Sequence, residues 1–248
     1  MCSNFNANSN PIYYNFTAKQ NNTPVNQKID VTEKVLNACK FSDDAYCSEE
    51  QCEKTEGINR FTLAPVNNFS AGAIYFETNN DRSKIWVAFR GTSTKRDIFS
   101  DFNMFKAKCD FLDGICFHRG FLNIYMAIKT DVHDKISQII NDNKLLGTDF
   151  EIIYTGHSLG GAVATLAYAE ALGEYTGNKV SLITFCAPCV ASEFACNYLE
   201  SKRALAGSMA MRFWRTGDVV PTGLDFKFTG YKHFGVSYEV PLKIKQKN

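Results

Sequence analysis

The sequence predicts an α/β protein with a mostly parallel central sheet, folded as a single domain. Short apolar runs alternate with helical patterns through the second half of the chain, which is typical of parallel strands joined by crossover helices. The 248 residues include 45% apolar and 21% charged side chains, as in an ordinary globular protein that buries a core. This composition argues against disordered, collagen-like and coiled-coil proteins.

The first part of the chain predicts an arm, a helix and a hairpin. Residues 1–28 are polar and rich in asparagine, so we expect a loosely ordered arm there and a folded domain over 29–248. Apolar residues at helical spacing predict a helix from Asp30 to Cys39. Two apolar runs, 73–77 and 85–89, flank the turn-forming residues Asn-Asn-Asp-Arg and indicate a β-hairpin.

The rest of the chain predicts alternating helices and strands. Apolar side chains from Phe121 to Ile140 recur at the spacing of one face of a long helix. The elements that follow are strand 151–155, helix 159–172, strand 180–185, a short helix 191–198 and strand 209–214. Because a helix-length segment separates each strand from the next, these strands are expected to run parallel.

Charge and hydropathy limit the partners of the protein. There are 27 Lys and Arg against 26 Asp and Glu, so no net charge draws the chain to nucleic acid or to acidic membranes. No apolar run approaches the ~20 residues of a transmembrane helix. The four histidines lack ligand spacing to any pair of cysteines, so we expect no zinc site. The chemistry predicted below requires no other metal and no cofactor. We expect a monomer.

Nine cysteines bear on the compartment in which the protein works. Cys47 with Cys52, and Cys109 with Cys116, have the spacing of short loop staples, which favours disulfides and secretion. Reduced thiols in the core are the alternative. The first residues, MCSNFNANSN, show neither the basic nor the apolar region of a signal peptide. Either a leader has been replaced by a start methionine, or the protein is intracellular.

The sharpest motif is Gly156-His157-Ser158-Leu159-Gly160-Gly161, between an apolar strand and an alanine-rich helix. A Gly-x-Ser-x-Gly in this setting is typical of a nucleophile elbow, a tight turn that exposes the serine at the end of a strand. We therefore predict Ser158 as a nucleophile. The alternative is a glycine-rich helix start that only packs closely or binds an anion.

A nucleophilic serine needs a base, and the base needs an acid that orients it. In proteins with this elbow the order is Ser, then Asp or Glu, then His, and His233 is the one histidine after Ser158. Of the acids between them, Asp218 directly follows a predicted strand, where α/β sheets place their sites, and Asp225 is the fallback. The oxyanion donors predicted are the N–H groups of Leu159 and Thr92.

These residues resemble the class 3 (fungal-type) lipases, a branch of the α/β hydrolases. The resemblance covers residues 30–240 and implies that fold, with Ser158, Asp218 and His233 as the triad. It also implies Thr92 and Leu159 as the oxyanion positions. The matching segments, in the family's order, are VAFRGTST (87–94), FHRGFLNIY (117–125), YTGHSLGGAVATLA (154–167), ITFCAPCV (183–190), RFWRTGDVVP (212–221) and GYKHFG (230–235).

The resemblance implies a serine carboxylic-ester hydrolase, first of all a triacylglycerol lipase that acts through an acyl-enzyme at a lipid–water interface. Phospholipase A1 and a feruloyl or short-chain esterase on the same triad are near alternatives, and a catalytically silent lipid-binding homologue is a remote one. The family's lid falls on residues 93–101, with Ile98 and Phe99 as its apolar contacts.

Three features depart from the family's pattern, and one of them is the charged sequence Lys95, Arg96 and Asp97 in the expected lid. Cys186-Ala-Pro-Cys189 replaces the usual small residue and arginine, and we interpret the two cysteines as core thiols rather than a redox pair. The interval of 15 residues from Asp218 to His233 is shorter than in many fungal members.

Overall fold

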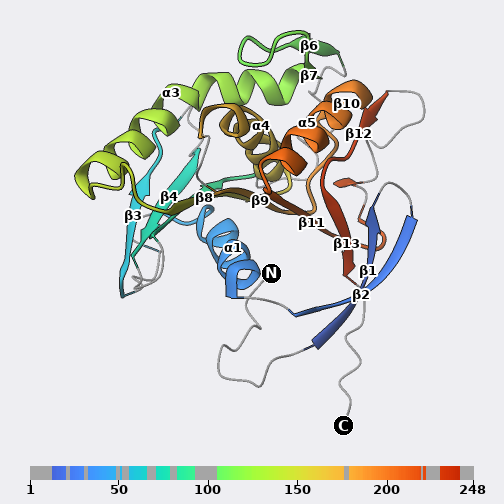
Figure 1. The fold of residues 1–248 in the computed structure, drawn as a ribbon, viewed down its shortest axis with the longest axis horizontal. Helices are drawn as coiled ribbons and strands as arrows, with labels where there is room; N and C mark the ends of the chain where they lie inside the picture. The colour runs from blue at the N-terminus through green and yellow to red at the C-terminus, as the bar shows by residue number, and fades with distance from the viewer. Residues whose placement is uncertain are drawn as a thin grey trace.

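The computed structural model describes residues 13–20, 23–30, 33–48, 51, 56–65, 71–78, 83–92, 105–175, 179–218, 220–221 and 230–240. These residues form a nine-stranded sheet with helices on both faces and a second sheet of four short strands (Figure 1). The order in the large sheet is β2-β1-β13-β11-β9-β8-β5-β4-β3, and in the small one β12-β10-β7-β6.

The strands of the large sheet are β1 Tyr13–Gln20, β2 Thr23–Asp30, β3 Ile58–Thr62, β4 Gly72–Glu77, β5 Ser83–Phe89, β8 Phe150–His157, β9 Lys179–Phe185, β11 Met209–Arg215 and β13 Val236–Val240. Those of the small sheet are β6 Lys106–Lys108, β7 Cys116–His118, β10 Ala191–Ser192 and β12 Tyr231–Lys232. The helices are α1 Glu33–Asp44, α3 Arg119–Asp142, α4 Leu159–Glu174 and α5 Glu193–Leu205.

The middle of the large sheet is parallel. Neighbouring pairs from β5 through β8, β9 and β11 to β13 all run in the same direction, whereas β3, β4 and the β1–β2 hairpin are antiparallel. The register sets Phe89 beside Gly156, and Phe185 beside both His157 and Phe213. The carboxyl ends of four central strands therefore meet at one edge of the sheet, which we call the carboxyl edge.

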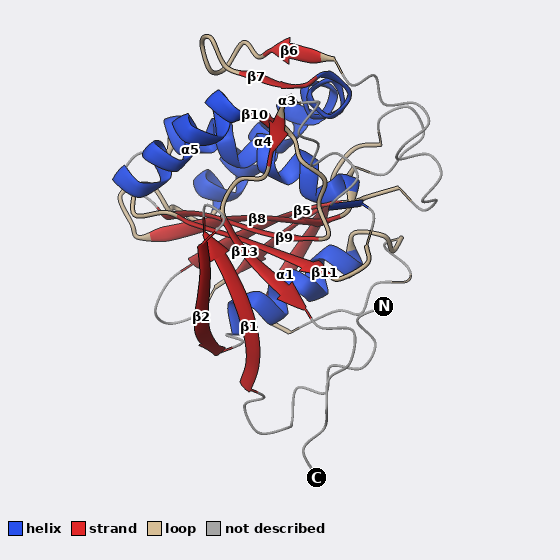
Figure 2. Ribbon diagram, turned by 90° about the vertical axis from the view of Figure 1, so that its right-hand side faces the viewer, coloured by secondary structure: helices blue, strands red, loops and turns tan. Residues whose placement is uncertain are grey.

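The helices cover the two faces unequally. Helix α1 lies on one face, and α3, α4, α5 and the small sheet lie on the other (Figures 1 and 2). On the α1 side Phe41 stacks on Tyr75 with ring centres 4.2 Å apart, and Trp86 is fully buried beside them. Burial of each such side chain contributes ~1.5–3 kcal/mol.

Helix α4 is buried around its whole circumference over most of its length, although it carries Thr165 and Glu170. Every residue from Leu159 to Ala171 is buried, because the helix lies between the sheet and the outer helices. Helix α3 is amphipathic and presents Phe121, Tyr125 and Ile136 to the core. Within the described part of the chain, no helix has both the length and the apolar character needed to span a bilayer.

Most of the predicted elements are confirmed. The hairpin is β4 with β5, the long helix is α3, and the alternation from β8 to β11 has the predicted order. The first helix was placed too early, because Asp30 ends β2 and α1 begins at Glu33. Besides the β1–β2 hairpin, six of the described strands were not predicted, because they are short and lack a long apolar run: β3, β6, β7, β10, β12 and β13.

The prediction of a loosely ordered arm over 1–28 is wrong for the residues that form β1 and β2. These strands pair with each other, and β1 also pairs with β13, where Thr17 lies beside Glu239. Strand pairing is made by backbone N–H and C=O groups, so a polar sequence can still complete an open sheet edge.

The predicted Cys109–Cys116 staple is also wrong, since both thiols are free. Lys108 pairs with Cys116 across β6 and β7, and the N–H of Cys109 donates to the carbonyl of Ile115. Because neighbouring positions of a strand point to opposite faces, the side chains of Cys109 and Cys116 diverge. Cys52 lies outside the described residues, so its predicted link to Cys47 stays a prediction.

Candidate active site

Ser158 lies in a strained turn between β8 and α4. Its φ of 56° and ψ of −125° place a non-glycine residue in the left-handed region, which costs ~1–3 kcal/mol and is found mainly where function requires it. A Cβ on Gly160 would lie far inside van der Waals contact of the Phe89 carbonyl oxygen, and one on Gly156 would meet the Gly160 backbone. Glycine is therefore required on both sides of the serine, as the elbow prediction expects.

The hydroxyl group of Ser158 is buried and makes no hydrogen bond to the described residues. The residue as a whole is 4% exposed. Its N–H donates to the carbonyl of Phe185 at 2.9 Å, which ties the elbow to the end of β9. A buried hydroxyl without a partner is uncommon, and this feature makes Ser158 a candidate functional group.

Asp218 reaches the same carboxyl edge from β11. Its N–H donates to the carbonyl of Arg215 at 3.1 Å, and its Oδ1 accepts the N–H of Val220 at 3.0 Å. Strand β9 lies between β8 and β11, so the strands that carry Ser158 and Asp218 are about 10 Å apart. That separation leaves room for a bridging side chain.

Cys186 lies in this interval. Its φ of 50° is again left-handed, and its N–H donates to the carbonyl of Phe213 at 2.7 Å. Burial, together with the hydrogen bond to the Asp218 carboxylate and the charge of that group, raises the pKa of the Cys186 thiol to about 12. The thiol therefore stays protonated and acts as a donor to Asp218, which fits a packed thiol better than a redox pair.

The predicted oxyanion donors lie beside the elbow. Leu159 is the first residue of α4, and the first N–H groups of a helix have no partner within the helix. Thr92 follows the end of β5, and its buried Oγ1 has no hydrogen-bond partner among the described residues. The predicted lid, residues 93–101 with Ile98 and Phe99, lies outside the described residues, as does Asp225.

His233 is not brought to this site. Its Nε2 lies 2.7 Å from the carbonyl oxygen of Pro221, so that nitrogen carries the proton and donates it. In the described structure no hydrogen bond joins His233 to Ser158 or to Asp218. Burial and the nearby Arg212 guanidinium lower the pKa of His233 to about 3, which keeps the ring neutral.

The sheet explains this position. His233 precedes β13, whose first residue, Val236, pairs with Met211 near the start of β11, and whose last residue, Val240, pairs with Arg215 near Asp218. The four residues between these pairs span about 13 Å. The imidazole lines a small pocket between α4, β9 and β11 rather than the space between Ser158 and Asp218.

A signal in the sequence could have revealed this. The residues after His233, VSYEV, alternate apolar with polar and form a strand. A base that acts at the carboxyl edge is expected after such a strand and not before it. The short interval from Asp218 to His233 agrees with a histidine that comes one strand too early.

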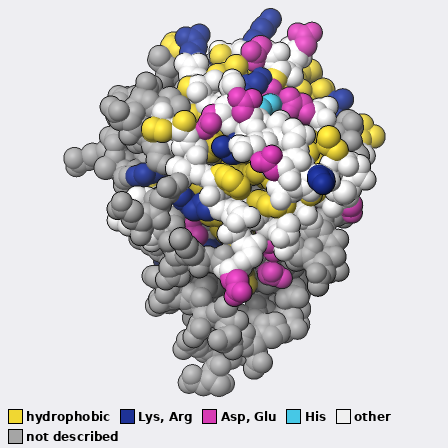
Figure 3. All heavy atoms as spheres, turned by 90° about the vertical axis from the view of Figure 1, so that its left-hand side faces the viewer, with side chains coloured by type: hydrophobic (Ala, Val, Ile, Leu, Met, Phe, Trp, Pro, Cys, Tyr) yellow, Lys and Arg dark blue, Asp and Glu magenta, His cyan; other side chains and the backbone are white. Residues whose placement is uncertain are grey.

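A second group of polar side chains lies between α3 and α4, away from the carboxyl edge. His133, Glu170 and Glu174 each offer a ligand atom within 4.8 Å of the others, and acidic side chains flank a histidine on that side of the molecule (Figure 3). However, Nε2 of His133 faces Glu170 at 3.3 Å while Nδ1 faces Glu174 at 3.7 Å. A histidine binds a metal through one nitrogen, so this arrangement fits an imidazolium between two carboxylates better than a metal centre.

The family described as Lipase (class 3) matches residues 86–226, more than half of the chain. The protein belongs to the class 3 lipase family. The match includes the Ser158 elbow, the Thr92 turn and Asp218, and it ends before His233.

Several fungal lipases are similar to this member of the class 3 lipase family. A secreted mono- and diacylglycerol lipase of Fusarium solani is 28% identical over 194 residues, which are 78% of this chain and 55% of that protein. The chain thus spans little more than half of that relative. Among solved structures, a triacylglycerol lipase from Penicillium expansum has a TM-score of 0.69 at 18% identity and covers 84% of this chain and 79% of its own.

A further solved structure is a triacylglycerol lipase whose catalytic centre is described as a serine protease triad. Its TM-score is 0.67 at 23% identity, covering 83% of this chain and 78% of its own. At this identity the similarity establishes the α/β hydrolase fold, which confirms the fold class predicted from the sequence.

Proposed function

We propose that this protein is a serine carboxylic-ester hydrolase that acts on acylglycerols, with Ser158 as its nucleophile. The observation that supports the proposal best is the Ser158 elbow, a strained turn between β8 and α4 whose buried Oγ has no hydrogen-bond partner among the described residues. Family membership and the mono- and diacylglycerol lipases among the similar proteins point to the same chemistry.

The proposed reaction follows from the positions of these groups. Oγ of Ser158 attacks the ester carbonyl and gives its proton to a base. The N–H groups of Leu159 and Thr92 donate hydrogen bonds to the carbonyl oxygen and stabilise the negative charge that develops on it. The intermediate collapses, the carbon–oxygen bond to the alcohol breaks, and the base returns its proton to the alcohol. Water then hydrolyses the acyl-enzyme by the same steps. Asp218 orients the base and stabilises its charged form.

Proton transfer from Ser158 to the base is the step that requires a rearrangement. His233 is the base that the sequence proposes, and it can act at Ser158 only after Nε2 leaves the Pro221 carbonyl and the ring moves to the carboxyl edge. The observed position of His233 favours a second candidate function, a lipid-binding homologue that keeps the site and turns substrate over slowly or not at all.

The substrate proposal is a long-chain acylglycerol, with phospholipids and feruloyl or short-chain esters as alternatives. We propose secretion because similar proteins are named as secreted. The sequence-based expectation of a monomer is kept as a proposal. Release of fatty acid from mono-, di- and triolein, phosphatidylcholine and a feruloyl ester separates the substrate classes, and light scattering during gel filtration measures the mass in solution.

The decisive experiment uses Ser158→Ala and a p-nitrophenyl phosphonate that labels an activated serine. Labelling and ester turnover in the wild type, both absent in Ser158→Ala, support the hydrolase. Labelling without turnover, together with binding of acylglycerol vesicles, supports the lipid-binding homologue. Turnover that persists in Ser158→Ala contradicts both candidates.

A further inference from the structure

The two proposed oxyanion donors belong to different segments, so their spacing depends on what holds those segments together. Thr92 follows β5 and Leu159 follows β8. The last register pair between these two strands is Phe89 with Gly156. The hydrogen bonds of the sheet therefore end before either donor is reached, and another contact has to set the distance between them.

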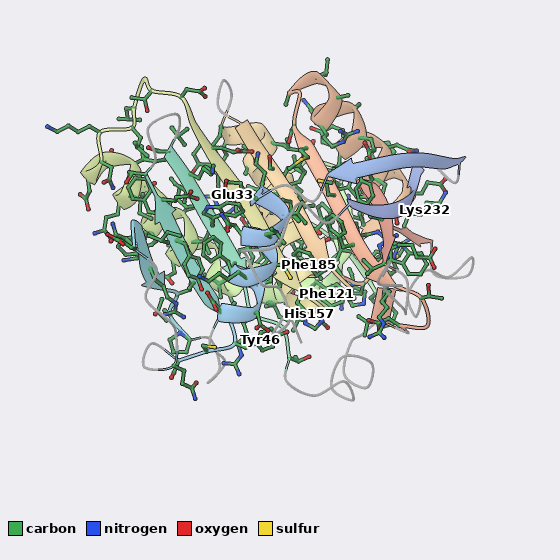
Figure 4. The ribbon with its side chains drawn as sticks, turned by 90° about the horizontal axis from the view of Figure 1, so that it is seen from below. Glu33, Tyr46, Phe121, His157, Phe185 and Lys232 are labelled. Carbon is green, nitrogen blue, oxygen red and sulfur yellow. The ribbon has the colours of Figure 1, made fainter. Side chains whose placement is uncertain are left out.

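Tyr46 contacts both segments. Its hydroxyl Oη lies 3.0 Å from Nδ1 of His157, the residue before Ser158. The same oxygen lies against the backbone of Gly91, the residue before Thr92, where an added Cβ would overlap it. A hydroxyl has one proton and two lone pairs, so it can donate to His157 while its oxygen stays against the Gly91 backbone. Figure 4 shows Tyr46 and His157 next to each other where α1 and β8 end.

The turn that leads to Thr92 fits tightly between these groups. A Cβ added to Gly91 would lie 2.6 Å from the carbonyl oxygen of His157 and would overlap the hydroxyl of Tyr46. The Gly91 backbone therefore occupies a slot between Tyr46 and the end of β8. Movement of either wall of this slot shifts the neighbouring Thr92 N–H.

Tyr46 is itself held in place. Its N–H donates to the carbonyl of Asp43 at 3.0 Å, and the Arg90 guanidinium lies 5.6 Å from the centre of its ring. One turn earlier, the buried Ser42 hydroxyl lies 2.9 Å from the hydroxyl of Thr155 on β8. Helix α1 is thus fastened to β8, and Tyr46 extends from its end over the carboxyl edge.

We propose that Tyr46 is a positioning residue that fixes the spacing of the Thr92 and Leu159 N–H groups around the developing oxyanion. This inference rests on the proposed function. Loss of one oxyanion donor lowers kcat by about 10²–10³-fold, and a displacement of about 1 Å can cost about 10²-fold. Loss of the Tyr46 hydroxyl loosens both donors without removing either, so a drop of about tenfold in the acylation rate is expected.

The test compares Tyr46→Phe with Tyr168→Phe. Tyr168→Phe also removes a hydroxyl hydrogen bond, the one to Ser208 at 2.7 Å. Tyr168 lies on α4, away from the proposed oxyanion donors. Acylation rate and KM for a p-nitrophenyl ester are measured with amide hydrogen exchange at Arg90 and Ser158. These two amides donate to the carbonyls of Ala71 and Phe185, so they report opening of the two segments and not the direct loss of a bond to Tyr46.

The expected result is specific to Tyr46→Phe: acylation about tenfold slower, unchanged KM, and faster exchange at both amides, none of which occurs in Tyr168→Phe. Acylation and exchange that match Tyr168→Phe would overturn the inference. If acylation of the wild type does not depend on Ser158, the proposed function fails. The hydrogen-exchange data then test the positioning role of Tyr46 by themselves. Unchanged exchange in Tyr46→Phe then refutes the positioning role, and faster exchange supports it.

Discussion

Nε2 of His233 lies 2.7 Å from the carbonyl oxygen of Pro221 and donates its proton to it. The ring therefore links Pro221, which follows Asp218, to the segment that precedes β13. A base at Ser158 would need this same nitrogen with its lone pair free. The described position thus gives His233 a structural role that excludes a catalytic one at the same time.

The first prediction concerns this histidine. With the ring bonded to Pro221, His233→Ala is expected to change the rate of phosphonate labelling at Ser158 by less than about threefold, because the ring does not reach the serine. The measurement is the labelling rate followed by intact-protein mass spectrometry, with Ser158→Ala as the blank. A loss of about a thousandfold or more in folded His233→Ala would instead show that the ring moves to the site and acts as the base.

The second prediction concerns the glycine of the elbow. Gly160→Ala is expected to destabilise the protein by about 2 kcal/mol or more, since its Cβ would overlap the backbone of Phe89 at the end of β5. Gly173, in the last turn of the same helix, has nothing within 4 Å of an added Cβ. Gly173→Ala is therefore a matched control that should stabilise by about 0.5–1 kcal/mol.

Urea unfolding of the two variants at constant pH measures this difference. Equal stabilities for Gly160→Ala and Gly173→Ala would contradict the close approach of the elbow to β5.

The third prediction concerns the thiol beside the proposed acid. Because the pKa of Cys186 is raised to about 12, iodoacetamide is expected to alkylate it slowly at pH 8. Asp218→Asn removes both the accepting carboxylate and its negative charge, so the pKa of the thiol should fall and its alkylation should become faster. Peptide mass spectrometry separates Cys186 from the other cysteines.

Cys196 supplies the comparison, since burial also raises the pKa of its thiol to about 12, without a contact to Asp218. Alkylation that rises equally at Cys186 and Cys196 in Asp218→Asn would indicate general loosening of the fold and not a specific hydrogen bond.

The fourth prediction concerns pH and the cluster between α3 and α4. The hydrogen bond to Glu170, and then the charge of Glu174, raise the pKa of His133 although burial opposes them; Lys129 and Tyr125 also face Glu170. The folded protein thus holds the His133 proton more tightly than the unfolded chain. The resulting stability is fully present below the ordinary value of ~6.5 and is lost as pH rises through the raised pKa.

The measurement is the free energy of unfolding of the wild type and His133→Gln between pH 5 and pH 9. The wild type should be more stable at pH 5 by about 0.5–1 kcal/mol, because the cluster is partly exposed to solvent, and this advantage should shrink by pH 9. Lys135→Gln, on the same helix and outside the cluster, should show no such change. An advantage that grows with pH would refute the bridging imidazolium.

The sequence alone determined the α/β class and the order of the central elements, and it placed the proposed nucleophile in a tight turn between a strand and a helix. Apolar periodicity and turn residues are local properties, and the Ser158 elbow is a local turn whose flanking glycines can be read directly. Asp218 could be chosen for a similar reason, because its position after a strand is visible in the chain. These features depend on residues that are neighbours in sequence.

Tertiary structure alone decided what depends on pairing between distant segments. The β1–β2 hairpin joins the sheet through β13, the side chains of Cys109 and Cys116 point to opposite faces, and Tyr46 meets both Gly91 and His157. The position of His233 is the clearest case. Chain order named it as the base, but it precedes β13, whose first residue pairs with Met211 near the start of β11. Parallel strands bring together the residues that follow their carboxyl ends, and His233 does not follow one.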